Sequence, residues 1–427
     1  MKFKLLCESV TTKERAIFYY DNKDNEIRDE QDNRVVVNDL LNIDPCKARP
    51  FVGFPYQKST FLSKLKIQLG LKCNMKCSYC SQAKSRAIPI KFTRAKALAN
   101  LIKPWQKDNV GNLIDLLQKR GIKIKPGGRV ELWGGEPLVY IKTLYKLVPR
   151  LRELYPDTGF HMITNGTLLT REIVDWLVGN RVSISISHDA HGYSLRDSVD
   201  PLKNSKIKTV WLYAQEQFKK AGLSFGFNVV ITKENCDIAR VQEYFEKHFV
   251  SGASFGFEGI VQPSTLEDIF EPRDAEILYE NIKYVLLFKP EAYGNLVLTA
   301  RKVLATLASN TPIENIWAKC EAPRNDVLTV DLEGNVLSCQ NYTKETHKIG
   351  DLKDFYEIES DQFNHWSSSS DCKECAVVQF CKGGCPLENN FCQNDYYYHF
   401  AIFKAVWFLL FRAEILKIEP IKESHEN

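Results

Sequence analysis

Residues 64–80 read KLKIQLGLKCNMKCSYC, and this stretch decides the fold. Its first part alternates polar and apolar side chains, with Leu65, Ile67 and Leu69 on one face, which predicts a β-strand. Three cysteines follow the strand at once and therefore lie on a loop at its carboxyl end: Cys73, Cys77 and Cys80. In parallel α/β folds this edge of the sheet binds ligands.

The chain beyond this loop alternates between strand and helix patterns up to residue 260. The strand candidates are residues 64–70, 129–133, 159–164, 181–187, 224–232 and 254–260. The helix candidates between them are residues 143–155, 169–180, 209–222 and 237–249. This alternation predicts an α/β fold with a parallel sheet and right-handed connections. Periodicity alone leaves open whether the sheet is doubly wound or a barrel.

The pattern divides the chain into five segments. They are a β-rich segment in 1–62 with strand candidates at 16–20 and 34–37, the α/β core in 63–260, a helical bridge in 261–319, a cysteine-rich domain in 320–395, and a C-terminal helix and tail in 396–427. The longest apolar run, AVWFLLF, lies in the predicted closing helix over 396–416. Because His399, Lys404 and Arg412 interrupt its surroundings, it predicts a buried helix rather than a membrane span.

Composition sets the broad class of the protein. The 427 residues are 44% hydrophobic and carry a net charge of only +4, which makes no case for nucleic acid. The N-terminus lacks a secretory signal, so we expect a cytoplasmic protein without membrane partners. Ten of its 13 cysteines are clustered, which favours metal binding over disulfides. We expect Cys7, Cys46 and Cys236 to be buried small hydrophobic residues.

The cysteine loop offers three thiolates. Soft thiolates select zinc or iron–sulfur clusters, and structural zinc sites usually take four ligands in two pairs. Three thiolates hold three corners of a four-iron cluster and leave one iron for a small molecule. Zinc stays an alternative on these residues alone.

The spacing Cys73-x3-Cys77-x2-Cys80, with the aromatic Tyr79 before the last cysteine, resembles the radical S-adenosylmethionine (SAM) superfamily. The resemblance implies a partial (β/α)6 TIM-type barrel over residues 63–260. It implies a [4Fe-4S] cluster whose open iron binds the amino and carboxylate groups of S-adenosylmethionine. In that family an electron from the cluster yields a 5′-deoxyadenosyl radical, which abstracts a hydrogen atom from the substrate.

Loops after later strands extend the resemblance. ELWGGEP ends the second strand with Gly134, Gly135 and Glu136, and in the family a GGEP loop holds the methionine amino group. The cofactor-binding set implied by the resemblance is Tyr79, Gly134, Gly135, Glu136, Asn165, Ser187 and Arg196. Ser187 and Arg196 match the residues that contact the ribose and the methionine carboxylate, which an arginine binds bidentately. We expect His188 and His191 to be solvated loop residues without a role.

The second cysteine cluster resembles the SPASM extension of radical enzymes that modify peptides. Its pattern is Cys320-x13-Gly334-x4-Cys339, then Cys372-x2-Cys375-x5-Cys381-x3-Cys385 and finally Cys392, and residues 329–339 read as a hairpin. The resemblance implies two auxiliary [4Fe-4S] clusters. The nearer would use Cys320, Cys339 and Cys385, with an open iron or a ligand from elsewhere, and the farther Cys372, Cys375, Cys381 and Cys392. Structural zinc is the alternative, because pairs spaced by two residues also bind zinc.

The resulting hypothesis is a radical SAM enzyme that forms a thioether, a carbon–carbon crosslink or an epimerised residue in a ribosomally made peptide. It implies a reducing partner such as flavodoxin or ferredoxin. Gln340 stands where sulfatase-maturing members have an aspartate base, and an amide cannot take that proton. Two alternatives stay open: a radical enzyme acting on a nucleotide or small metabolite, and a non-enzymatic electron carrier or zinc-binding module.

Overall fold

The computed structural model describes residues 1–37, 57–82, 109–197, 199–262, 266–309, 320–360, 370–385, 387 and 392–421. Its central feature is a nine-stranded sheet with strand order β12-β11-β10-β4-β5-β6-β7-β8-β9. A second sheet of four strands has the order β13-β1-β2-β3. None of the described helices combines the length and the apolar character needed to cross a membrane.

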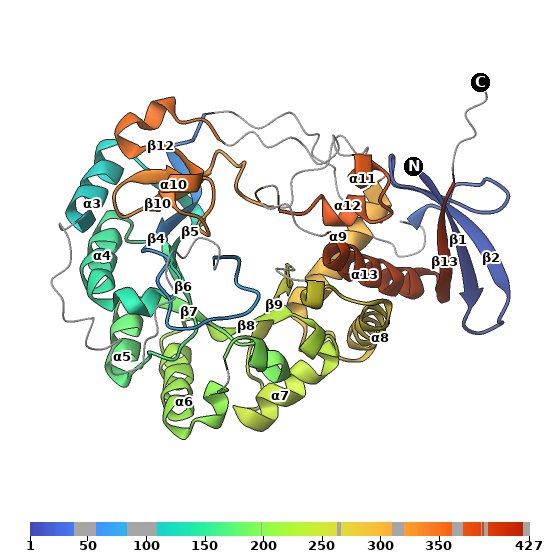
Figure 1. The fold of residues 1–427 in the computed structure, drawn as a ribbon, viewed down its shortest axis with the longest axis horizontal. Coiled ribbons are helices and arrows are strands. Elements are labelled where there is room, and N and C mark those ends of the chain that lie inside the picture. The colour runs from blue at the N-terminus through green and yellow to red at the C-terminus, as the bar shows by residue number, and fades with distance from the viewer. Residues whose placement is uncertain are drawn as a thin grey trace.

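Six neighbouring strands of the large sheet are parallel and follow the order of the chain. They are β4 (Phe61–Gln68), β5 (Lys123–Trp133), β6 (Gly159–Thr164), β7 (Val182–Ser187), β8 (Phe225–Ile231) and β9 (Phe255–Ile260). Helices cover the outside of this curved sheet (Figure 1): α3 (Asn109–Lys119), α4 (Ile141–Leu154), α5 (Arg171–Gly179), α6 (Ser205–Lys220) and α7 (Val241–His248). The expected partial (β/α)6 barrel is confirmed, as are the six predicted strands and the four predicted helices; helix α3 was not predicted.

The barrel has a buried apolar outer face and a polar inner face. Along β7, for example, Val182, Ile184 and Ile186 are fully buried, while the serines between them are partly exposed. Period-two alternation places each set on one face, so the serines line the inside. Because complete TIM barrels fill the inside with branched apolar side chains, this polar interior indicates space for ligands.

The cysteine-rich domain continues the same sheet. Here β10 (Val327–Asp331) pairs parallel with β4, and β11 (Asn335–Leu337) and β12 (Lys348–Asp351) follow antiparallel. The predicted hairpin over 329–339 is confirmed, with Gly334 in a left-handed conformation in its turn. The described part of this domain also contains the short helices α10 (Lys344–His347), α11 (Ser370–Lys373) and α12 (Val378–Cys381).

Helices follow the barrel, as predicted for the bridge within the described residues: α8 (Pro272–Phe288) and α9 (Gly294–Ser309). The closing helix α13 (Gln393–Phe411) packs against both, and its Trp407 is fully buried, which confirms the prediction of a buried helix. The predicted end at residue 416 is wrong, because Arg412 takes a left-handed conformation and stops the helix. The predicted tail instead begins with strand β13 (Ala413–Ile421).

The N-terminal segment forms the small sheet, with β1 (Lys2–Ser9), β2 (Arg15–Asp21) and β3 (Glu26–Arg28), and β13 pairs antiparallel with β1. The predicted strand at 16–20 is confirmed. The predicted strand at 34–37 is wrong, because only a single bridge from Arg34 to Arg28 forms there. Cys7 and Cys236 are buried as expected, and Cys46 lies outside the described residues.

Candidate active site at the carboxyl ends of the barrel strands

The cysteine loop leaves β4 at the carboxyl edge of the barrel. The thiols of Cys73, Cys77 and Cys80 are partly exposed, and the amide of Cys80 donates to the carbonyl of Cys77 at 3.3 Å. The amide of Ser78 donates to the carbonyl of Leu195 at 2.9 Å, which ties the loop to the segment after β7. Three accessible soft thiols on one loop suit an iron–sulfur cluster with one iron left for another ligand.

The glycine pair after β5 packs against the backbone that leads into this loop. The amide of Gly135 donates to the carbonyl of Gly70 at 2.9 Å, and that of Glu136 to the carbonyl of Lys72 at 2.9 Å. A Cβ on Gly135 would lie 2.3 Å from the carbonyl oxygen of Leu71. Residue 135 must therefore be glycine because the backbone that leads to Cys73 passes directly over it.

Glu136 joins the ends of β5 and β6. Its Oε1 accepts from the Leu138 amide at 2.9 Å and from the Thr164 hydroxyl at 2.6 Å, and its Oε2 accepts from the Asn165 amide at 2.6 Å. Burial raises the pKa of this carboxyl to about 7, although the three donors oppose the rise. Oε2 keeps a lone pair, since a carboxylate oxygen can accept two hydrogen bonds.

Asn165 connects the end of β6 to the cysteine loop. Its Nδ2 donates to Oδ1 of Asn74 at 2.8 Å, and Asn74 in turn donates to the hydroxyl of Thr167 at 2.9 Å. Oδ1 of Asn165 accepts from that hydroxyl at 2.7 Å. Asn74 lies next to Cys73, so this ring of side chains fixes the first cysteine relative to the third barrel strand.

A buried ion pair follows β7. Arg196 donates through Nε and Nη2 to the two carboxylate oxygens of Asp189, at 2.8 and 2.9 Å, and the Tyr79 hydroxyl donates to the same carboxylate. The Arg196 guanidinium also lies 5.5 Å from the centre of the Tyr79 ring. Arg196 and Tyr79 were expected in the cofactor site, and Asp189 now brings them together beside the cysteine loop.

Polar residues of β7, β8 and β9 face the hollow of the barrel. Ser187 ends β7 opposite Asn228 of β8, and Asn228 donates through Nδ2 to the carboxylate of Glu258 at 2.9 Å. Glu258 is accessible to water, and partial desolvation by the surrounding protein raises the pKa of its carboxyl. Asp189, Asn228 and Glu258 were not among the predicted site residues, although strand alternation places the last two on the inner face.

The two histidines after β7 are not both solvated. His188 is fully buried, with its Nε2 3.0 Å from Asp200 and its Nδ1 accepting from the Ala190 amide at 3.0 Å. The expectation of a solvated loop residue is therefore wrong for His188. Burial lowers the pKa of its imidazole and keeps it neutral. His191 is partly exposed and bonded to Asp237.

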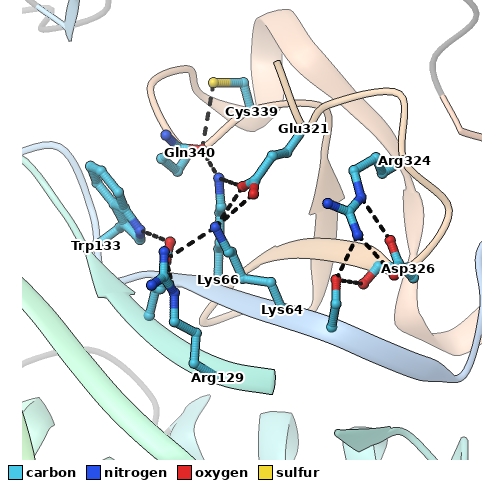
Figure 2. A network of polar contacts seen from close by, with 11 residues as sticks. Lys64, Lys66, Arg129, Trp133, Glu321, Arg324, Asp326, Cys339 and Gln340 are labelled. Atoms are coloured by element: carbon cyan, nitrogen blue, oxygen red, sulfur yellow. Dashed lines mark hydrogen bonds and ion pairs between the residues drawn. The ribbon is translucent and has the colours of Figure 1, made fainter. Parts of the chain in front are cut away.

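A polar network joins the inner face of the barrel to the cysteine-rich domain (Figure 2). Lys64 lies between two carboxylates, 3.3 Å from Glu131 of β5 and 2.7 Å from Glu321. Lys66 contacts Glu321 at 3.1 Å and donates to Oε1 of Gln340 at 3.3 Å. Burial opposes ionisation of Glu321, but the two lysines outweigh it and lower the pKa of the carboxyl. Glu321 therefore stays charged, and its ion pairs with Lys64 and Lys66 join the cysteine-rich domain to β4.

Cysteines of the proposed nearer set meet beside this network. A cavity of about 80 Å³ has Cys320, Cys339, Lys66 and Gln340 in its wall. Burial raises the pKa of the Cys339 thiol to about 11; Lys66 lowers it, while the thiolates of Cys385 and Cys320 raise it. Cys320 and Cys385 thus lie within electrostatic reach of Cys339, and Cys320 and Cys339 share the wall of a cavity next to the barrel.

The proposed farther set lies near the small N-terminal sheet. Burial raises the pKa of the Cys375 thiol to about 11, and the thiolates of Cys392 and Cys372 raise it further. Asn22, between β2 and β3, donates to the carbonyls of Lys373 and Cys375, each at 2.8 Å. The thiol of Cys381, expected in the same set, lies within 4.8 Å of ligand atoms of Asp395 and His399 on α13.

Comparisons with known proteins agree with this architecture. Residues 67–241 match the model of the Radical SAM superfamily. The radical SAM cyclopropyl synthase TigE of Paramaledivibacter caminithermalis is 22% identical over 339 residues, which cover 76% of this chain and 68% of TigE.

Solved structures share the fold. A structure of native anSMEcpe with bound AdoMet and a Cp18Cys peptide has a TM-score of 0.54 and 20% identity, over 81% of this chain and 98% of anSMEcpe. A tagged anSMEcpe with bound AdoMet has a TM-score of 0.55 and 20% identity, over 82% and 98%. Members of the superfamily use a [4Fe-4S] cluster and AdoMet, and residues 67–241 of this chain form a radical SAM domain.

Proposed function

We propose that this enzyme modifies a peptide or protein substrate by radical chemistry, forming a crosslink, a thioether or an epimerised residue. The observation that carries the proposal is the continuous sheet from β9 to β12, which joins the barrel to a domain with seven cysteines. The fold of anSMEcpe, which holds AdoMet and a peptide, supports it over 98% of that protein. TigE is named a cyclopropyl synthase, so ring formation belongs to the same range of products.

The residues of the barrel edge have distinct roles in this proposal. Cys73, Cys77 and Cys80 would hold the [4Fe-4S] cluster, which would supply the electron for reductive cleavage of AdoMet. Glu136 receives the methionine ammonium on its remaining lone pair. Gly134 and Gly135 let the backbone approach this group closely, and Asn165 fixes the cysteine loop.

Arg196 provides the positive charge for the methionine carboxylate. Its Nη1 is not used by the Asp189 pair and can donate to that group. Tyr79 packs beside the guanidinium, and Ser187 serves the ribose from the end of β7. Asp189 is a positioning residue, because it aims Arg196 and Tyr79 without itself facing a cationic ligand.

The cysteine-rich domain, residues 320–395, is proposed to hold two auxiliary clusters. The nearer would take Cys320, Cys339 and Cys385, and the farther Cys372, Cys375, Cys381 and Cys392. Lys66 holds the side chain of Gln340, which follows Cys339, and an amide in this place cannot act as a base. The proposed product classes are therefore those that need no proton acceptor at this position.

The remaining proposals concern organisation and partners. The domain boundaries are those of the sequence: 1–62, 63–260, 261–319, 320–395 and 396–427. A flavodoxin or ferredoxin would supply electrons, and a reducing cytoplasm suits exposed clusters. The small N-terminal sheet offers an edge to which a peptide strand can add. Unchanged peptide affinity after deletion of residues 1–60 would rule out that last role.

The test is anaerobic reconstitution followed by analysis of clusters and products. We expect about twelve iron and twelve sulfide per chain, as three four-iron clusters require, and formation of 5′-deoxyadenosine. Replacement of Cys73, Cys77 and Cys80 with alanine should abolish that product and leave the other clusters in place. A peptide encoded beside the gene is the first substrate to try. A product two mass units lighter indicates a crosslink, and unchanged mass with altered stereochemistry an epimerisation.

Two outcomes would contradict the proposal at different levels. Zinc in the Cys73 loop, or no cleavage of AdoMet under reducing conditions, would overturn the radical chemistry. AdoMet cleavage with a small metabolite or nucleotide as the only modified substrate would overturn the peptide assignment alone.

A further inference from the structure

Lys66 of β4 reaches from the barrel to the cysteines of the proposed nearer set (Figure 2). Its side chain is only 10% exposed, and its Nζ lies 3.1 Å from the Glu321 carboxylate and donates to Oε1 of Gln340 at 3.3 Å. The same Oε1 lies 3.7 Å from Sγ of Cys339. One amide oxygen therefore separates the Lys66 ammonium from a sulfur of this set, and Cys320 lines the same cavity.

Strand β4 fixes this arrangement from its inner face. Lys66 and Gln68 are two residues apart on the strand, so their side chains lie on the same side of the sheet. Gln68 donates through Nε2 to the carbonyls of Gln340 and Tyr342, at 2.7 and 2.8 Å. Gln68 thus holds the backbone that follows Cys339, while Lys66 holds the side chain of Gln340. The strand itself sets the distance from the ammonium to the sulfur.

The ion pairs around Lys66 contain more positive than negative charge. Glu131 is shared by Arg129 and Lys64, at 2.6 and 3.3 Å, and Glu321 is shared by Lys64 and Lys66, at 2.7 and 3.1 Å. Hydrogen bonds and cations outweigh burial and lower the pKa of both carboxyls, which are therefore ionised at neutral pH. Three cations face two carboxylates, so this chain of ion pairs has a net charge of +1.

Gln340 leaves the charge of Lys66 intact. Its amide accepts the hydrogen bond but is neutral, whereas an aspartate at this position would cancel the lysine. Because the site is buried, water and salt screen the charge only weakly. The reduction potential of an iron–sulfur cluster depends on the charges and hydrogen bonds around its sulfurs. A nearby positive charge stabilises the reduced cluster, which is the more negative of the two states.

We propose that Lys66, with Gln340 as its neutral partner, raises the reduction potential of the nearer auxiliary cluster. The inference rests on the proposed function only for the presence of a cluster at Cys320, Cys339 and Cys385. Lys66 and Gln340 are positioning residues, since they act through the cluster. A higher potential makes this cluster a better electron acceptor.

The test is a potentiometric titration of the anaerobically reconstituted full chain, followed by electron paramagnetic resonance without AdoMet or substrate. The reduction wave that disappears in Cys339→Ser belongs to the nearer cluster. Lys66→Met should shift this wave to lower potential. We expect at least about a tenfold change in the ratio of reduced to oxidised cluster at a fixed potential, which is about 59 mV for one electron. Lys66→Arg keeps the charge and should stay near wild type.

Substitutions of the two partners change the charge in both directions. Gln340→Asp should lower the potential, whereas Gln340→Asn, of the same size but without charge, should leave it near wild type. Glu321→Gln removes a negative charge and should raise the potential. An unchanged potential in Lys66→Met, or equal shifts in Gln340→Asp and Gln340→Asn, would overturn the inference. If Lys66→Met does not assemble the cluster, the comparison of the two Gln340 variants decides.

Failure of the proposed function has a different signature. A titration without any wave that depends on Cys339 would remove the nearer cluster, and this inference with it. Absence of 5′-deoxyadenosine would contradict the radical chemistry alone, because the potentials are measured without AdoMet and the inference would stand.

Discussion

The guanidinium of Arg196 and the carboxylate of Asp189 form a bidentate ion pair inside the barrel, with nitrogen–oxygen distances of 2.8 and 2.9 Å. Asp189 is fully buried, and it also accepts from the Val230 amide at 2.9 Å and from the Tyr79 hydroxyl. One carboxylate thus connects the cysteine loop, the segment after β7 and strand β8. Its geometry sets the position of the charge proposed to bind AdoMet.

Replacement of Asp189 with asparagine should lower the free energy of unfolding, because it leaves the Arg196 charge buried without its partner. Removing one member of a buried pair typically costs about 3–5 kcal/mol of unfolding free energy. We expect that loss in chemical denaturation and at least about tenfold weaker AdoMet binding by equilibrium dialysis.

Arg196→Ala should weaken AdoMet binding as well. Wild-type affinity in Arg196→Ala would discard its role at the carboxylate.

AdoMet binding should depend on pH through Glu136. Burial raises the pKa of this carboxyl to about 7, so its charged form becomes dominant only above that pH. If Glu136 binds the methionine ammonium, AdoMet affinity should rise between about pH 6 and pH 8. The same raised pKa also links stability to pH. The folded chain keeps the Glu136 proton up to about pH 7, whereas the unfolded chain releases it near the usual pKa of 4.5. The free energy of unfolding should therefore fall as pH rises from 4.5 to about 7.

The control for this pH dependence is Glu136→Gln, which keeps the shape of the side chain and cannot ionise. Its AdoMet affinity should be low and flat across the same range, measured on chains with equal iron content. An affinity that still rises with pH in the variant would assign the titration to another group.

Local patterns were enough to predict most of the barrel. The strands alternate strictly, as in β7, and the helices have broad apolar faces, so each element can be recognised from its own residues. Pairing between distant segments leaves no such signal. The parallel pairing of β10 with β4, in which Val330 lies opposite Ile67, joins residues more than 250 positions apart and was not predicted. The same holds for β13 on β1.

The site was predictable only in part, for related reasons. Motifs with fixed spacing, such as the Cys73 loop and Gly134–Glu136, were recognised from the sequence and lie together at one edge. Asp189 was passed over because its importance comes from Arg196 and Tyr79, which reach it only in the folded chain. His188 was misjudged because burial by α6 and α7 cannot be read from its own loop.

Gly135→Ala should disturb the cysteine loop. The added methyl group would lie 2.3 Å from the Leu71 carbonyl and 2.5 Å from that of Lys72, and backbone atoms cannot move aside as a flexible side chain can. Overpacking of this kind costs about 1–3 kcal/mol. We expect a lower thermal midpoint and the loss of about four iron per chain, from the cluster of this loop.

The matched control is Gly179→Ala at the end of α5. A Cβ there meets nothing within 4 Å, so the variant should be as stable as the wild type or slightly more so. If Gly135→Ala retains full iron content and stability, the backbone of residues 71–72 does not constrain position 135 as the structure indicates.

Asn22→Ala should loosen the cysteine-rich domain from the small N-terminal sheet. Asn22 is fully buried, donates to the carbonyls of Lys373 and Cys375, and accepts on its own carbonyl from Nε2 of Gln379 at 2.7 Å. Removal of its amide leaves two carbonyls without these donors, at about 1–3 kcal/mol each. Iron at the Cys372–Cys375 pair should therefore be lost faster on exposure to a chelator, while 5′-deoxyadenosine formation stays near wild type. Asn33→Ala in the exposed turn after β3, whose side-chain amide donates to Asp29 at 3.1 Å, is the control and should lose iron at the wild-type rate. Equal rates in the two variants would show that the N-terminal sheet does not brace this part of the domain.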